Sequence, residues 1–523
     1  MRTFAPIVVL ASIFVLGPAV AAAPAPSAPL GSPEFLPTPE RPVGWRGDGT
    51  GRYPGATPPT SWERKLNGNG YTTKNVLWAT PLPNTSIASP IVVGSRVFVT
   101  SDFADLVCLD KQTGRLLWIR SNSDFEGQTD EERKAEPAYG EKLAPLAAQL
   151  EQANAEVVEA LNALQADAPA AAVRPPAPAL LKKRAIEKQI QDEQQAIDKK
   201  KYKRYWAQGV YGYSGPTPTS DGRRVFACFA SNVVACYDLD GRRRWITLGT
   251  SVGWPEKGNF VSPLLCGNRL VVQANEMRGY DADTGKLLWA NRADIETNGG
   301  LFRLQAGDEA VAAMQSGFFT RVRDGKAVWN AEAFGNGTPT PIVEGGVIYA
   351  WAGRPRLFNA FRIAASTEGG KLEPAYSFKI EWADDELPIT EKRKFDREIN
   401  ASPLFADGLI YHLIVGGGLV VSDAASGEMV YRKLLPMKPR TEYWGWGGAS
   451  ASPALAGKYI YLMDNQGGSV VIEPGKVYKE VAVNRLEELR DGKEQVQCLS
   501  TPVFDGTRMY YRMPGYLYCI GTP

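Results

Sequence analysis

Short alternating runs of apolar and polar residues, separated by turn residues, make up most of the chain from about residue 75 onward. The clearest example is the segment 259–293, NFVSPLLCGNRLVVQANEMRGYDADTGKLLWANRA, in which four such runs follow one another. Each run is too short for a stable helix, and each break contains the Gly, Asn or Asp that a hairpin requires. The pattern predicts four antiparallel β-strands, the last ending on Trp289, with Gly285 taking a positive φ in the final turn.

Copies of this unit recur along the chain. A Gly-x-x-x-aromatic turn and strand occurs at Gly114/Trp118, Gly241/Trp245, Gly285/Trp289, Gly325/Trp329 and Gly427/Tyr431. A Ser-Pro or Thr-Pro pair opens units at Ser89-Pro90, Thr217-Pro218, Ser262-Pro263, Thr340-Pro341, Ser402-Pro403, Ser452-Pro453 and Thr501-Pro502. The spacing of 44 residues from Trp245 to Trp289 is typical of a four-stranded propeller blade. With one more unit at 301–329, which lacks the Pro, the count predicts eight blades.

The last blade takes its fourth strand from near the start of the chain. The final unit, from Ser500, has three runs before the sequence stops, and the missing fourth run is present near the start as NVLWATPL, residues 75–82. Pairing these ends would close the ring and remove two exposed sheet edges. We therefore predict an all-β, eight-bladed β-propeller closed by N- and C-terminal strands. Its blade-docking side chains are Trp78, Trp118, Trp245, Trp289 and Trp329.

Segments such as CLDKQTGRLLW (108–118) and GYDADTGKLLW (279–289) resemble the tryptophan-docking repeats of the pyrroloquinoline-quinone (PQQ)-like propeller superfamily. That superfamily contains quinoprotein dehydrogenases and BamB-like propeller subunits of outer-membrane assembly machinery. The resemblance covers about residues 75–120 and 208–523, and it implies a fold more strongly than a function. GWRGDGTGRYPG (44–55) is similar to the Trp-Arg-Gly segment that often precedes secreted propellers of this superfamily.

The N-terminal part predicts export. Residues 1–23 have one basic residue, an apolar run and small residues near Ala21–Ala23, as in a secretory signal peptide, and the run is too short for a membrane span. A retained N-terminal anchor is the alternative. Without a Cys near the cut, we expect a periplasmic or extracellular protein that is not a lipoprotein, unlike BamB. Residues 24–74 form a Pro/Gly-rich N-terminal segment, of which we expect residues 24–60 to be a tether with little regular structure.

An insertion interrupts the repeats. Between propeller residues 75–120 and 207–523, residues 121–206 are rich in Ala, Glu, Gln and Lys, with apolar residues at three- and four-residue steps. Residues 124–168 carry 3 basic and 11 acidic side chains, and residues 174–204 carry 10 basic and 4 acidic. Antiparallel pairing of two helices would bring these opposite charges together. We predict a helical hairpin on the channel face, either a solvated decoration or an arm that docks a partner.

Most catalytic chemistry has no candidate residues. His412 is the only histidine, which excludes Ser-His-Asp, Cys-His and multi-histidine metal sites, and we expect it to be structural. The sequence has no c-type haem motif, no phosphate loop and no adjacent Cys-Cys pair of the kind that quinoprotein alcohol dehydrogenases place against the quinone. No metal ligands are assigned. A formal net charge of +2 gives no general attraction to nucleic acid.

The positions of the cysteines favour a packing role over disulfide bridges. Cys108, Cys236 and Cys519 occupy the same slot of the third strand in three blades, where a small apolar residue is needed. Cys228 and Cys236 are placed to face each other across one hairpin, so a disulfide between them stays open.

The loops before each first strand hold the candidate binding residues. Aromatic, amide and charged side chains there could bind a quinone, a sugar or a peptide at the channel face. These residues are Tyr211, Tyr213, Trp254, Lys257, Asn259, Asn336, Arg397, Asn400, Trp444 and Trp446. The two tryptophans of TEYWGWGGAS (441–450) are explained equally by a plug of the channel and by a ligand platform.

Two functions remain. The first, which we favour, is a non-catalytic binding and assembly scaffold of the cell envelope, similar to BamB. It would act through its inter-blade loops and hairpin, without cofactor, nucleic acid or membrane span. The second is a quinoprotein oxidoreductase acting on alcohols or sugars with PQQ and calcium. Fold alone does not decide between them.

Overall fold

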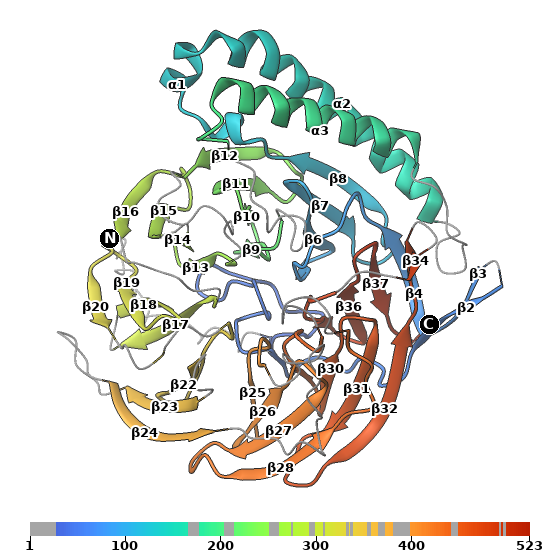
Figure 1. Cartoon of the computed structure of the whole chain (residues 1–523), viewed down its shortest axis with the longest axis vertical. Coiled ribbons are helices and arrows are strands. Elements are labelled where there is room, and N and C mark those ends of the chain that lie inside the picture. Colours follow the sequence, from blue (N-terminus) through green and yellow to red (C-terminus); the bar gives the residue numbers. More distant parts are fainter. Residues whose placement is uncertain are drawn as a thin grey trace, which may run out of the picture.

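The computed structural model describes residues 28–522 except 69, 166–176, 203–213, 250–260, 274–275, 292–298, 307–308, 331–333, 335–337, 353–356, 364–371, 380–397, 441–447, 491–492 and 495–497. The molecule is a ring of eight four-stranded antiparallel sheets with a pair of helices on its rim (Figure 1). The eight-bladed propeller with an inserted helical hairpin, predicted from the repeats, is confirmed.

The first four blades follow the chain, each running from the axis to the rim. Blade 1 consists of β5 (Ile91–Val93), β6 (Arg96–Ser101), β7 (Asp105–Asp110) and β8 (Leu116–Ser121). Blade 2 consists of β9 (Thr219–Ser220), β10 (Arg224–Cys228), β11 (Val233–Asp238) and β12 (Arg243–Leu248). Blade 3 consists of β13 (Leu264–Cys266), β14 (Arg269–Gln273), β15 (Met277–Asp281) and β16 (Leu287–Asn291). Blade 4 consists of β17 (Leu301–Ala306), β18 (Glu309–Met314), β19 (Phe318–Arg321) and β20 (Ala327–Asn330).

The other blades repeat this order, and the last one borrows a strand. Blade 5 consists of β21 (Ile342–Glu344), β22 (Val347–Ala352), β23 (Leu357–Ile363) and β24 (Leu372–Lys379). Blade 6 consists of β25 (Leu404–Ala406), β26 (Leu409–Leu413), β27 (Gly418–Asp423) and β28 (Met429–Leu434). Blade 7 consists of β29 (Ala454–Ala456), β30 (Tyr459–Met463), β31 (Gly468–Glu473) and β32 (Lys479–Leu486). Blade 8 consists of β35 (Val503–Asp505), β36 (Arg508–Arg512), β37 (Tyr516–Ile520) and, from the N-terminal side, β4 (Val76–Pro81).

The ring closes as predicted. Strand β4 pairs antiparallel with β37, and Trp78 lies opposite Cys519. An ion pair of 2.8 Å between Lys111 and Asp505 joins blade 1 to blade 8 next to this seam. The closing strand therefore comes from the opposite end of the chain to the rest of its sheet.

Four of the five predicted docking tryptophans lie over a glycine of the next blade, whereas Trp329 packs in a core cluster with Ile348 and Phe361 of blade 5. The indoles of Trp78, Trp118, Trp245 and Trp289 lie over the turn glycine of the following blade, respectively Gly114, Gly241, Gly285 and Gly325. The indole nitrogen of Trp289 donates a hydrogen bond of 2.9 Å to the Val322 carbonyl, and that of Trp245 one of 3.0 Å to the Ala282 carbonyl. The glycine is required because it has a positive φ and because a β-carbon there would overlap the indole.

Blade 5 achieves the same contact with a different residue. Here Tyr376 of β24 lies over Gly427, and its hydroxyl donates to the Ala424 carbonyl at 2.9 Å. The sequence repeat does not predict this substitution, because no glycine precedes Tyr376 at the four-residue spacing of the other units.

The N-terminal segment is not a free tether. Residues 28–67 pack on the propeller, and Tyr53, Ala56 and Trp62 are buried. Strand β1 (Arg52–Tyr53) adds in parallel to β29, and β2 (Glu63–Asn67) with β3 (Gly70–Lys74) extends the outer side of blade 7. Pro- and Gly-rich composition suggested a linker, but extended chain can also be held by backbone pairing, which leaves no periodic signature. The predicted signal peptide lies outside the described residues.

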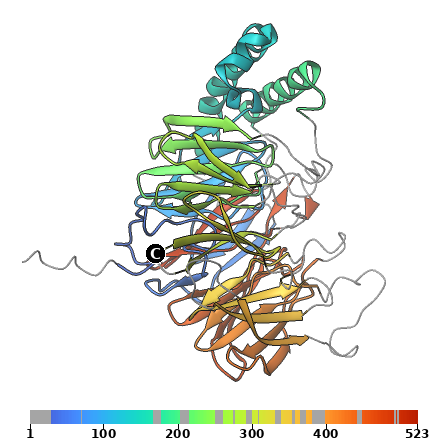
Figure 2. The same cartoon turned by 90° about the vertical axis from the view of Figure 1, so that its left-hand side faces the viewer.

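The insertion forms the two predicted antiparallel helices, α2 (Ala144–Gln165) and α3 (Pro178–Ile197), preceded by α1 (Asp130–Ala135) and the short turns 124–127 and 139–143. Ion pairs of 2.7 Å (Lys182–Glu156) and 2.9 Å (Lys142–Glu193) join the arms. Its expected position on the channel face is wrong, because the hairpin lies on the rim against the outer strand of blade 1 (Figures 1 and 2).

All six cysteines lie in the described part of the chain as buried free thiols. Cys228 is paired in register with Val234, and Cys236 with Phe226. The two thiols therefore do not form the disulfide that the sequence left undecided. Within the described ranges, no helix combines the length and the apolar character that crossing a membrane demands. A small hairpin of β33 (Leu489–Arg490) and β34 (Lys493–Glu494) follows blade 7.

Candidate functional site: the central channel

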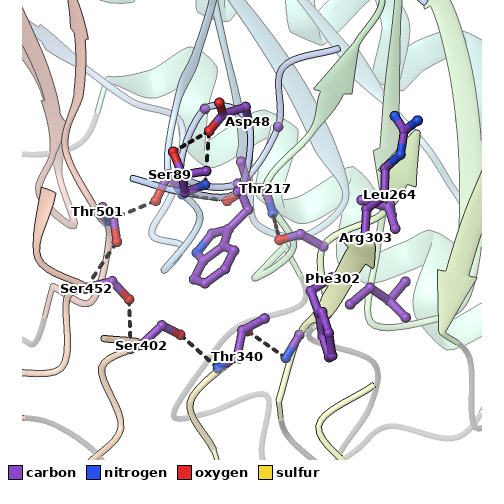
Figure 3. A pocket seen from close by; sticks show the side chains of 18 of the residues that line it. Asp48, Ser89, Thr217, Leu264, Phe302, Arg303, Thr340, Ser402, Ser452 and Thr501 are labelled. Atoms are coloured by element: carbon purple, nitrogen blue, oxygen red, sulfur yellow. Dashed lines mark hydrogen bonds between the residues drawn. The ribbon is translucent and has the colours of Figure 1, made fainter. Parts of the chain in front are cut away.

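A circle of hydrogen bonds ties the blades together around the axis (Figure 3). At each link, the backbone N–H at the opener of one blade donates to the hydroxyl of the next opener. The links run from Ser89 to Thr217 (3.1 Å), Thr217 to Ser262 (2.9 Å), Gly300 to Thr340 (2.9 Å), Thr340 to Ser402 (2.8 Å), Ser402 to Ser452 (3.0 Å), Ser452 to Thr501 (3.2 Å) and Thr501 to Ser89 (2.8 Å). The repeated Ser/Thr-Pro openers are therefore structural, since their hydroxyls fasten neighbouring blades.

Blade 4 interrupts this circle. Gly300 takes the place of the hydroxyl residue, so it donates to Thr340 but offers Ser262 no acceptor side chain. A β-carbon at Gly300 would lie 2.5 Å from Thr340 Oγ1, so the close approach of blades 4 and 5 leaves no room for one. The missing Ser/Thr-Pro opener at 301–329 was visible in the sequence, but its consequence for the circle was not.

The N-terminal segment enters one end of the channel and is fixed there by Arg46. This guanidinium is fully buried and donates hydrogen bonds of 3.0 Å to the carbonyls of Pro403 and Pro453, in blades 6 and 7. Burial lowers the pKa of Arg46 to about 10, so it stays charged at neutral pH. Gly51 lies directly against the guanidinium, where a β-carbon would be 2.5 Å from Nη2. The Trp-Arg-Gly segment is thus a buried anchor.

The segment leaves part of the channel open. A cavity of about 670 Å³ lies between residues 30–52 and the inner strands, within the size range of ligand sites. Blades 3, 4 and 5 contribute mainly apolar side chains to its wall, among them Leu264, Phe302 and Ile342. Exposed lining residues, including Arg303 and Asp48, mark its opening to solvent (Figure 3).

The charges around this cavity are mixed. Its lining includes Arg41, Arg52, Arg303, Glu40, Asp48 and Glu344. Arg52 is paired with Glu344 at 2.7 Å, and the Asp48 carboxylate accepts from the Thr50 hydroxyl at 2.6 Å. A quinone bearing several carboxylates needs an excess of cations and donors, and the described lining balances cations with carboxylates. The described lining therefore has no excess of cations for such a quinone.

Of the predicted channel-face residues, Asn400 alone lies in the described ranges. It lines the cavity, and its amide nitrogen donates to Ser450 Oγ at 3.4 Å. The other nine lie outside the described residues: Tyr211, Tyr213, Trp254, Lys257, Asn259, Asn336, Arg397, Trp444 and Trp446. The lining from the N-terminal segment was missed, although GWRGDGTGRYPG was the signal that could have found it.

His412 is fully buried and is not among the residues that line the cavity. Its Nε2 is 3.1 Å from Ser422 Oγ, and the rings of Trp351 and Phe358 pack edge-on against the imidazole. Burial lowers the pKa of His412 to about 3, so the ring is neutral at ordinary pH. The geometry agrees with a packed, structural histidine.

A second polar cluster lies under the hairpin. Lys183 of α3 is almost fully buried and contacts Asp105 of blade 1 at 2.9 Å as well as Glu187 one turn further along α3. Ser121 of β8 donates to Asp105 at 2.6 Å. Beside this cluster, the side-chain amide of Asn162 satisfies the backbone of Leu116, accepting at 2.8 Å and donating at 3.0 Å. The hairpin therefore covers the outer edge of blade 1 and is held there by buried ions.

A closed ring of eight four-stranded sheets, joined blade to blade by tryptophan–glycine docking, defines a propeller of the PQQ-like repeat class. The family model described as outer membrane protein assembly factor BamB matches residues 66–166 and 191–394, more than half of the chain. The chain belongs to this family.

A curated relative and two solved structures are similar to the chain. The outer membrane protein assembly factor BamB of Burkholderia pseudomallei (strain K96243) is 24% identical over 265 residues, 50% of this chain and 63% of that protein. The match thus spans less than two thirds of that relative. The crystal structure of BamB from Moraxella catarrhalis has a TM-score of 0.42 and 14% identity, covering 59% of this chain and 81% of that one. The computationally designed Ika8 protein has a TM-score of 0.46 and 10% identity, covering 86% and 99%.

Proposed function

We propose that this protein is a non-catalytic scaffold of the cell envelope that binds partner proteins during assembly. The observation that carries the proposal is membership of the BamB family over more than half of the chain. The similar protein of Burkholderia pseudomallei is an outer membrane protein assembly factor. The rigid ring with its docked hairpin suits such a role, because it presents large fixed surfaces.

The hairpin supplies the surface on which to test this. Leu181 of α3 is 53% exposed, and the ion pair of the neighbouring Lys182 with Glu156 of α2 lies beside it in sequence. Single exposed apolar residues are common on protein surfaces, so Leu181 serves as the position at which the proposal is tested. We propose that partner proteins contact α3 through this residue.

Site-specific photocrosslinking in cells tests the scaffold. A photoreactive amino acid at Leu181 should give a discrete crosslinked band in the envelope fraction. The same group at Val477, 78% exposed and far from the hairpin on blade 7, is the matched control and should give none. Absence of a band from Leu181 and from neighbouring exposed hairpin positions would overturn the docking role.

We propose further that the scaffold works without PQQ or calcium. The balanced charges of the cavity lining support this. Titrating purified protein with PQQ and calcium should leave the quinone absorbance unchanged and give no dye reduction with alcohols or sugars. A saturable absorbance change would instead favour the oxidoreductase.

For location, we propose export with cleavage near Ala21–Ala23 and no lipid on the mature protein. The apolar run and small residues of the first 23 positions support this. Mass spectrometry of the N-terminal peptide from periplasmic and secreted fractions measures both features. An uncut or lipid-modified terminus would contradict the proposal.

A further inference from the structure

The propeller already binds one extended stretch of polypeptide through the inner edges of its blades. Strand β1 pairs with β29 of blade 7, with Arg52 opposite Leu455 and Tyr53 opposite Ala456. On the other side of the axis, Val43 and Ser220 of blade 2 exchange two backbone hydrogen bonds, of 2.9 and 2.8 Å. The inner strands of this ring are therefore able to accept an added strand.

The inner edges of blades 3, 4 and 5 face the cavity instead. Strands β13, β17 and β21 are each the first strand of their sheet, and within the described ranges no other strand pairs with them on the axial side. Strand β17 is the longest first strand of the eight blades, with six residues against two or three. An unpaired strand edge has a row of backbone donors and acceptors that pairs readily with extended chain.

The side chains around β17 suit an apolar strand. Leu264 and Phe302 line the cavity beside this edge (Figure 3), and Ile342 of the next blade also lines it. The space of about 670 Å³ is continuous with the part of the channel that the N-terminal segment fills. Arg303 reaches the mouth, where its side chain is exposed.

We propose that this cavity binds an extended apolar segment of a partner protein, which adds as a strand to the inner edge of blade 4. Backbone hydrogen bonds to β17 give the affinity, and side-chain pockets formed by blades 3 and 5 select apolar residues. The chain's own N-terminal segment, paired to blades 2 and 7 of the same channel, is the observation that favours a strand over other occupants. This site goes beyond the scaffold function, and it does not depend on the hairpin.

A peptide of alternating Val and Thr, acetylated, amidated and fluorescently labelled, is the probe for the full-length protein. Binding measured by fluorescence anisotropy should be saturable. A peptide with Pro at every second position has no N–H there and cannot form the ladder, so it should bind at least tenfold more weakly. Equal binding of the two peptides, or no saturation by the first, would overturn the proposal.

Two variants separate the cavity from the outer surface. Leu264→Trp fills the cavity and should weaken peptide binding at least tenfold, whereas Leu288→Trp, on the exposed outer strand of the same blade, should leave it unchanged. Circular dichroism checks that both variants fold. Unchanged binding by a folded Leu264→Trp protein would exclude the cavity.

Chemical labelling tests the site from the mouth of the cavity, at an exposed lining residue. Arg303→Cys places a thiol at the mouth, and Arg323→Cys places one on the same blade at a 62% exposed position. The native cysteines are buried, so the introduced thiol is the reactive one. A maleimide-bearing Val/Thr peptide should label position 303 at least tenfold faster than position 323. Equal labelling rates at the two positions would contradict the proposed site. If light scattering shows dimers and position 303 is protected from labelling in them, the inner edge of blade 4 binds a second copy of this chain instead.

Discussion

At the scale of single residues, an indole and a glycine make each blade contact. Trp289 is 9% exposed, donates to Val322 at 2.9 Å and covers Gly325. Within its own sheet it lies opposite Gly279, where a β-carbon would be only 2.1 Å from the indole. One side chain therefore depends on glycine in two different sheets.

Trp289→Ala should destabilise the propeller by roughly 3–5 kcal/mol, because truncation of a buried aromatic ring leaves a cavity between two blades. The shift of the urea unfolding midpoint measures the loss. Leu288→Ala is the control, since that neighbouring side chain is 41% exposed and should change the midpoint little. Equal effects of the two substitutions would contradict the docking role of the indole.

Arg46→Met should release the N-terminal segment. The substitution leaves the carbonyls of Pro403 and Pro453 without donors, which costs roughly 1–3 kcal/mol for each buried group. Limited proteolysis should then cut within residues 28–60 of the variant while the wild-type segment resists. Arg41→Met, at an exposed position of the same segment, is the matched control. Resistance of Arg46→Met equal to wild type would contradict the anchor.

At the scale of elements, the hairpin is the part whose attachment depends on pH. The buried cluster holds one cation, Lys183, and two carboxyl groups, Asp105 and Glu187, so its charges balance when one carboxyl is protonated. Burial raises the pKa of Glu187 to about 7, and it raises the pKa of Asp105 as well, while the two carboxylates raise the pKa of Lys183 against burial. Arg184 also faces Glu187 and opposes its shift in part.

A carboxyl whose pKa is raised in the folded state binds its proton more tightly there than in the unfolded state. Its stabilisation is complete below the ordinary pKa of about 4.5 and is lost as the pH rises through about 7. Asp124, whose buried carboxyl has its pKa raised to about 6, adds a contribution of the same sign. The hairpin should therefore be held more tightly at pH 5 than at pH 8.

Hydrogen exchange of α3 measures this dependence, after correction for the intrinsic rate at each pH. Protection should fall between pH 5 and pH 8 in the wild type, and Glu187→Gln should flatten the profile because it removes the main titrating group. Lys188→Gln, at an exposed position of the same helix, should keep the wild-type profile. A flat wild-type profile would contradict the role of the cluster.

The same elements show what sequence could predict. Trp78 was placed beside the C-terminal strands because its spacing to Trp118 matches the repeat, and repeat spacing reflects one blade per period. Tyr376 was missed because the contact it makes, over Gly427, needs an aromatic ring but no fixed spacing to a preceding glycine. The contact of Asn162 with Leu116 was missed as well, since a single amide on an amphipathic helix has no pattern.

The candidate site was less predictable than the ring. Channel residues such as Arg46 and Leu264 come from segments that are far apart in sequence, and only the closed ring brings them together. The apolar wall of the cavity also uses residues that a blade core would use, so periodicity cannot tell the two roles apart.

At the scale of the whole molecule, the pairing of β4 with β37 closes the ring and leaves no free sheet edge between the first and last blades. Deleting residues 516–523 removes β37, leaving β4 without its partner and the edge of β36 uncovered. Such edges pair between molecules, so the truncated protein should aggregate and unfold at lower urea. Deleting only 522–523, which keeps the hydrogen bond of 3.0 Å from the Gly521 N–H to the Asn75 carbonyl, should change neither property. Light scattering and the unfolding midpoint measure both, and a monomeric truncated protein of full stability would contradict the closure.

The closing strand and the channel anchor also affect how the protein is made. Arg46 is bound by Pro403 and Pro453, Trp62 stacks on Tyr461, and Trp78 pairs with Cys519, so early residues depend on partners that are synthesised much later. Until those partners are made, the early residues lack these contacts and are more exposed to proteases and to other nascent chains. Closure of the ring must therefore wait for the late segments, and a holding chaperone should be needed most before they are made.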